Sequence, residues 1–74
     1  MATRKIFAQN LRYWRKERGL SQEQLALRAG IDRTYISALE RELYSVSIDT
    51  LGKLAKVLNI EPAKLLERPP RSGK

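Results

Sequence analysis

The sequence of 74 residues predicts an all-α fold, a compact bundle of five helices. One observation is that apolar residues recur at helical spacing, as Phe7, Leu11 and Trp14 do. A second is that residues suited to helix caps come just before the apolar stretches. A third is that apolar residues flank four of these caps and form candidate hydrophobic staples. The four pairs are Leu20 with Leu25, Ile31 with Ile36, Val46 with Leu51 and Ile60 with Leu65.

The first helix is expected to begin near Thr3 and to reach about Arg18, where Gly19 ends it. Its apolar stripe, named above, faces the rest of the bundle. We therefore interpret the aromatic residues Phe7 and Trp14 as part of the core.

The second and third helices are separated by a very short turn. Ser21 and Gln24 have the spacing of a capping box, and Gly30 suits the left-handed position past the end of the second helix. Asp32 then caps a third helix that begins at about Arg33. Because only three residues lie between the two helices, we expect them to cross steeply, as in a helix-turn-helix.

The third helix has two different faces. Ile36 and Leu39 point inward, and the opposite side is small, polar and basic. A solvated face more often carries long Glu and Lys side chains, whereas small side chains let another surface approach closely. We interpret this side as a docking face, and its residues are Arg33, Thr34, Ser37, Ala38 and Arg41.

The C-terminal third is expected to hold the last two helices and a tail. Ser47 caps the fourth helix, Asn59 can end it, and Pro62 opens a short fifth helix. One domain should therefore cover residues 1–67, and residues 68–74 should form a flexible basic tail.

Charge and composition narrow the function. Fifteen Lys and Arg against eight Asp and Glu give a net charge of +7, which suits a polyphosphate partner. The sequence contains neither Cys nor His, so thiolate and imidazole chemistry is excluded, and its carboxylates are scattered. We expect no enzyme, no metal, no cofactor and no small-molecule ligand. Without a membrane-length apolar run or a signal peptide, we expect a cytoplasmic protein.

The stretch from residue 19 to residue 41 resembles the helix-turn-helix of the Cro and phage-repressor (XRE) family of DNA-binding regulators. The matching residues are Gly19-Leu20-Ser21-Gln22, Leu25-Ala26, Ala29-Gly30-Ile31, Ile36-Ser37 and Leu39-Glu40-Arg41, followed by Leu51, Leu54, Ala55, Leu58 and Leu65. The resemblance covers about residues 7–67 and implies a lambda-repressor-like DNA-binding domain. Residues 32–37 also resemble the recognition-helix start of restriction-modification controller proteins.

The resemblance implies a transcriptional regulator that binds double-stranded DNA at a palindromic or pseudopalindromic operator, with autoregulation of a restriction-modification operon as a narrower expectation. The expected base-contacting residues are Arg33, Thr34, Ser37 and Ala38, of which Arg33 can pair with guanine. The expected contacts to the DNA backbone are Gln22, Tyr35, Arg41, Tyr44 and Ser45. The alternative is an antitoxin-type protein-interaction module that binds DNA secondarily.

Two opposite charges border the expected core. Arg15 follows Leu11, and Glu40 follows Ile36, by one helical turn. An isolated buried charge is costly, so we predict that Arg15 and Glu40 pair. The family places an Arg–Glu ion pair at these positions, which makes the pair structural.

After Arg41 the sequence departs from the family pattern, because Glu42 and Val46 stand where Gly and Pro are usual. Without a glycine to end the third helix, we expect Leu43 to extend its inner stripe by one turn. Glu42 would repel phosphate, although Tyr44 can still donate a hydrogen bond to DNA.

A symmetric dimer is expected, because one recognition helix reads too few base pairs for a specific site. Val57 lies off the buried stripe of the fourth helix, and further apolar residues follow it. The expected dimer surface is Val57, Ile60, Pro62 and Leu66. The alternative is that Ile60 and Leu66 complete the core of the monomer.

Overall fold

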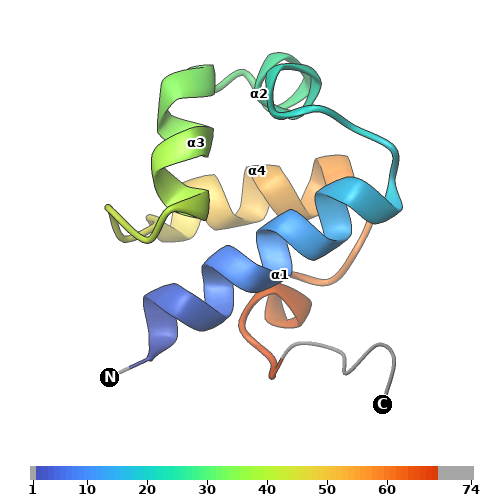
Figure 1. Cartoon of the computed structure of the whole chain (residues 1–74). Helices are drawn as coiled ribbons and strands as arrows, with labels where there is room; N and C mark the ends of the chain where they lie inside the picture. Colours follow the sequence, from blue (N-terminus) through green and yellow to red (C-terminus); the bar gives the residue numbers. More distant parts are fainter. Residues whose placement is uncertain (1, 69–74) are drawn as a thin grey trace.

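The computed structural model describes residues 2–68 and holds four α-helices and one 3-10 helix in this range (Figure 1). They are α1 (Thr3–Glu17), α2 (Gln22–Ala29), α3 (Arg33–Glu40), α4 (Ile48–Leu58) and the 3-10 helix η1 (Pro62–Leu65). The described part is thus all-α. Apart from Arg68, the expected tail lies outside the described residues.

The prediction of five helices is wrong for the last one. The segment that Pro62 opens, η1, is a single 3-10 turn and not a fifth α-helix. Asn10 of α1 is almost fully buried, and its Nδ2 donates to the carbonyl of Leu65 at 3.0 Å and to that of Glu67 at 2.6 Å. Residues 69 and 70 are prolines, which cannot continue an α-helix and have no N–H to donate, so Asn10 supplies the Leu65 carbonyl with the partner that a helix could not. Pro62 does open the segment, as predicted.

Side-chain caps set the start of three helices. The Ser21 Oγ accepts from the Gln24 N–H at 3.0 Å and the Gln24 Oε1 accepts from the Ser21 N–H at 2.8 Å, so the predicted capping box is confirmed. Asp32 caps α3 through the N–H of Thr34, and Ser47 caps α4. At α1 an alanine stands in the N-cap position, and no side chain caps the helix.

Each of the four α-helices is followed, within two residues, by a residue of positive φ, and the N–H of the next residue donates to the carbonyl five residues back. These four residues are Gly19, Gly30, Glu42 and Asn59. The sequence predicts three of them as terminators. Glu42, with φ of 65°, is the exception.

The prediction that Leu43 extends the inner stripe of α3 by one turn is wrong, because the positive φ of Glu42 turns the chain away from the helix. The helix ends at Glu40, and the Leu43 N–H donates back to the Ala38 carbonyl at 3.0 Å. Leu43 is 50% exposed and adds nothing to the inner stripe. Glu42 therefore does at this turn what glycine usually does, at the cost of placing a Cβ in the left-handed region.

Replacing Glu42 with glycine is expected to raise the free energy of unfolding by about 0.5–1 kcal/mol. A side chain in the left-handed region costs more than the extra freedom that glycine has in the unfolded chain. Thermal unfolding measures the change. Glu42→Gln is the matched control, because it removes the charge and keeps the strained Cβ. Equal stabilisation by both variants would assign the effect to charge.

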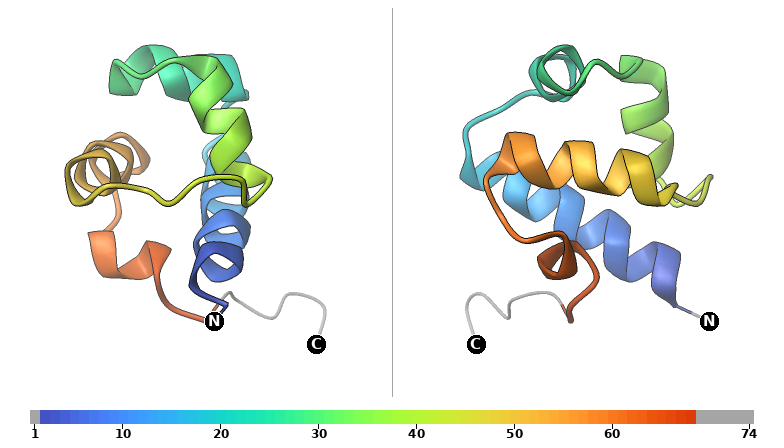
Figure 2. Two further views of the ribbon diagram at one scale, coloured as in Figure 1. Left: turned by 90° about the vertical axis from the view of Figure 1, so that its left-hand side faces the viewer. Right: turned by 180° about the vertical axis from the view of Figure 1, so that it is seen from behind.

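The core lies where the four α-helices meet, and η1 closes it from one end. Its fully buried apolar side chains are Leu11, Leu25, Ile36, Leu39, Leu54, Leu58 and Leu65. Phe7 is 3% exposed, and Trp14 packs against the core while partly buried, so both are core residues as predicted. Figure 2 shows α2 above α1 and α4, and α3 running down one side of the bundle at a steep angle to α2.

Candidate nucleic-acid interface

The exposed face of α3 begins at its N-terminus. Arg33 and Thr34 are exposed, Ser37 is half-buried, and Arg41 is exposed just past the helix end. Ala38 does not share this face, because it is only 6% exposed and its methyl group has little surface to offer. The exposed polar positions follow each other at helical spacing along one side of α3.

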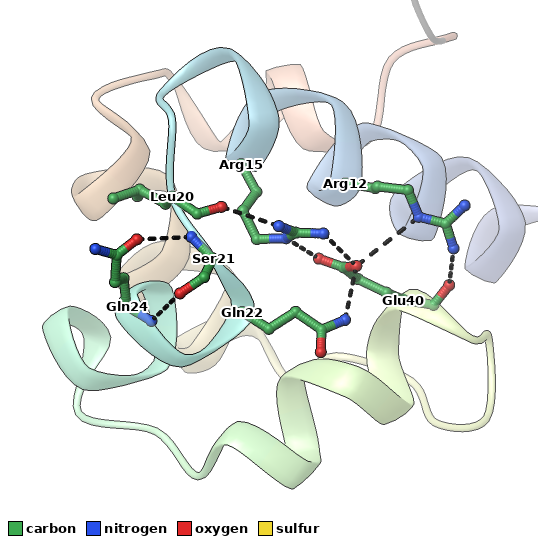
Figure 3. A network of polar contacts seen from close by, with 7 residues as sticks. All are labelled: Arg12, Arg15, Leu20, Ser21, Gln22, Gln24 and Glu40. Atoms are coloured by element: carbon green, nitrogen blue, oxygen red, sulfur yellow. Dashed lines mark hydrogen bonds and ion pairs between the residues drawn. The ribbon is translucent and has the colours of Figure 1, made fainter.

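A buried carboxylate locks α3 against α1 and α2 (Figure 3). The Glu40 side chain is 2% exposed, and its Oε2 and Oε1 accept from the Arg15 Nε at 2.6 Å and Nη2 at 3.1 Å. The Gln22 Nε2 donates to the same Oε1 at 3.0 Å, and the Arg12 Nη2 donates to the Glu40 carbonyl at 3.1 Å. The Arg15 Nη1 also holds the Leu20 carbonyl at 2.9 Å. Three helices are thereby fixed in one relative orientation.

Sequence reasoning missed two members of this network. It expected Gln22 on the DNA backbone, but the Gln22 amide donates to Glu40, so its side chain positions α2 against α3. The backbone N–H of Gln22 remains, since the first N–H groups of a helix have no partner within it. Arg12 was detectable, because it precedes Arg15 by three residues and shares its side of α1.

The loop between α3 and α4 is held against α3 by Tyr35. The Tyr35 hydroxyl donates to the Ser45 carbonyl at 3.2 Å, and its ring lies 6.2 Å from that of Tyr44. The Arg4 Nε donates to the Ser45 Oγ at 3.1 Å, so the start of α1 adds a cation that sequence reasoning missed. Tyr44 is 58% exposed. Tyr35 thus supports the loop, and Tyr44 stays at the surface.

The four residues expected at a dimer interface do not form one patch. Val57 and Ile60 pack against the core and are partly buried, and Pro62 is exposed at the start of η1. Val57 lines an open hollow between α2 and α4, whereas Leu66 lines a different hollow beside α1. The single surface that the sequence suggested is therefore divided in two.

The hollow beside α1 is apolar and has a volume of about 250 Å³. Its apolar lining, which we call the Ile48 face, consists of Phe7, Tyr44, Val46, Ile48, Leu51 and Leu66. Ile48 is 85% exposed and Leu66 is 45% exposed. Ile48 is the first residue of α4 and stands outside the core.

Two features are absent from the described range, residues 2–68. None of its helices has the length and apolar character to cross a membrane. It also holds no group of three acidic, Cys or His side chains that could bind a metal ion.

A short helix held across α2, with a polar and basic exposed side, defines the helix-turn-helix class of DNA-binding domains. A helix-turn-helix family model (HTH_3) matches residues 11–65. The chain therefore belongs to this family, which is of the XRE type.

Two curated relatives illustrate the family. A hypothetical transcription factor from Neisseria meningitidis is 39% identical over 66 residues, which are 89% of this chain, and the chain spans 62% of that protein's length. Control protein C.SmaI from Serratia marcescens is 47% identical over 68 residues, 92% of this chain and 81% of the relative.

Two solved structures have closely similar folds. The restriction-modification controller protein C.AhdI from Aeromonas hydrophila has a TM-score of 0.83 and 45% identity, over 88% of this chain and 98% of that chain. SinR, a master regulator of biofilm formation solved in complex with DNA, has a TM-score of 0.80 and 37% identity, over 82% of this chain and 98% of that chain.

Proposed function

We propose that this chain is a transcription regulator that binds double-stranded DNA by placing the exposed side of α3 in the major groove. The observation that carries this proposal is the orientation of α3, which the buried Glu40 fixes against α1 and α2. A recognition helix must be rigid relative to its backbone contacts before its side chains can select bases. The net charge of +7 supplies attraction to phosphate.

Base selection is assigned to Arg33, Thr34 and Ser37, and Ala38 is left out because it is buried. Arg33 is the main reader, since its guanidinium can pair with guanine O6 and N7. Contacts to the DNA backbone are assigned to the Gln22 N–H, Arg41, Ser45 and Arg4, whereas Tyr44 is assigned to the dimer interface because it lines the Ile48 face. In this assignment Tyr35 orients the loop and does not contact DNA itself.

Arg33→Ala is expected to weaken operator binding by about 1–3 kcal/mol at one base pair of each half-site and to relax the choice of base there. Its effect on random DNA should be small. Arg41→Ala is the matched control, because losing a phosphate contact should weaken binding to operator and random DNA alike. Titration of both DNAs at two salt concentrations measures this. An equal loss on both DNAs for Arg33→Ala would make Arg33 a phosphate contact.

Operator binding is assigned to a twofold dimer, in which two copies of α3 enter successive major grooves about 34 Å apart. We place the dimer interface on the Ile48 face. An exposed isoleucine and leucine around an apolar hollow are costly in water, and a second copy can cover them with its own identical face. With chromosomal DNA as its ligand, the protein is assigned to the cytoplasm.

We infer further that the chain controls a restriction-modification operon, including its own gene. The similarity to C.SmaI and C.AhdI over most of all three chains supports this role. A methyltransferase and an endonuclease encoded beside its gene would support it. A small toxin gene in that place would favour the antitoxin reading instead.

A further inference from the structure

A second open hollow lies between α2 and α4, and it differs from the Ile48 face in its charge. It has a volume of about 290 Å³ and is lined by Arg28, Ala29, Lys53, Lys56 and Val57. The right-hand view of Figure 2 faces α4, with α2 directly above it. Three cations therefore surround a floor made of an alanine and a valine.

No carboxylate balances these three cations in the described part of the chain. The ion pairs found between residues 2 and 68 involve Arg12, Arg15 and Lys64. Arg28 and Lys56 each stand in the last turn of a helix, where a cation is favourable for that helix. Their convergence with Lys53 around one hollow nevertheless gathers like charge, so an anionic partner would be attracted strongly to it.

We propose that this hollow, which we call the basic hollow, binds an acidic segment of a partner protein. The segment would place carboxylates on the three cations and a short apolar side chain on Ala29 and Val57. This function goes beyond DNA binding, because α3 and its flanking loop serve the operator and the basic hollow lies on α2 and α4.

Two other occupants fit less well. A second copy of this chain is a poor source of carboxylates, because it carries only eight acidic residues against fifteen basic ones. Duplex DNA is convex and presents its phosphates outermost, so it does not place an apolar group on the floor of a concave hollow while its phosphates meet the three cations. An acidic peptide supplies both the charge and an apolar side chain.

The test is an NMR titration of the full chain with the peptide Glu-Glu-Leu-Glu-Glu-Leu-Glu-Glu, following backbone amides. We expect the largest shifts at residues 28–29 and 53–57, and weaker binding of a peptide with glutamate in place of leucine. The double variant Lys53→Gln with Lys56→Gln should lower the affinity about tenfold, since it removes two exposed charge pairs with the peptide. Both side chains are exposed, so the fold should persist.

The matched control is Lys5→Gln with Lys16→Gln, which removes the same charge from exposed positions on α1. This variant should bind the peptide like the unchanged protein. An equal loss in both double variants would show attraction to net charge alone and would overturn the proposal. So would shifts centred on α3, no shifts with millimolar peptide, or the same shifts at residues 53–57 on adding a random DNA duplex.

Discussion

Glu40→Ala is expected to lower the free energy of unfolding by about 3–5 kcal/mol. The Arg15 side chain is only 11% exposed, and two nitrogens of its guanidinium donate to the Glu40 carboxylate. The change removes this carboxylate and leaves the guanidinium without an anionic partner. It also removes the acceptor of the Gln22 amide. Chemical denaturation followed by circular dichroism measures the loss.

An exposed ion pair provides the matched control. Lys64 and Glu67 lie 3.7 Å apart with side chains 52% and 56% exposed, so Glu67→Ala should cost less than about 1 kcal/mol. Arg15→Met combined with Glu40→Leu should regain much of the loss, because it leaves no unpaired buried charge. If Glu40→Ala cost no more than Glu67→Ala, the ion pair would have no structural role.

Ile48→Glu is expected to convert the proposed dimer into a folded monomer that binds its operator more than tenfold more weakly. A carboxylate would have to be buried at the interface, and binding would lose its second half-site. Ile48 is 85% exposed in the monomer, so the fold itself should be unaffected. Sedimentation measures the oligomeric state, and titration with operator DNA measures the affinity.

Leu66→Glu should act like Ile48→Glu, because both residues line the same hollow. Leu27→Glu is the control, since Leu27 is an equally apolar residue, 81% exposed, on α2 and outside the Ile48 face. It should leave the dimer intact. If the Ile48 and Leu66 variants both sediment as dimers while Leu27→Glu is a monomer, the interface lies on α2.

Much of the fold follows from interactions between residues that are close in the sequence, and the residue types indicate these interactions. The starts of α2, α3 and α4 were predictable because Ser21, Asp32 and Ser47 cap backbone N–H groups a few residues away. The approach of Arg15 and Glu40 was predictable because each follows a buried apolar residue by one turn. The orientation of α3 therefore depends on residues that could be recognised in advance.

The remaining features depend on long-range packing. A glutamate has no preference for positive φ, so the residue type at position 42 did not indicate that α3 ends there. The buried hydrogen bond from Asn10 to the Leu65 carbonyl joins residues that are 55 positions apart in the chain, so no local pattern indicates it. Helical spacing assigned Val57 to a dimer surface, because spacing alone does not show how closely neighbouring helices pack against that residue.

Hydroxyl-radical footprinting of the chain on the DNA upstream of its own gene tests most directly whether it is a dimeric, sequence-specific regulator. We predict two protected stretches on one face of the duplex, related by twofold symmetry, with centres about 34 Å apart. Protection should weaken steeply as salt is raised, because phosphate contacts release counterions. Uniform protection along the fragment, or protection only at concentrations that also cover random DNA, would contradict this account.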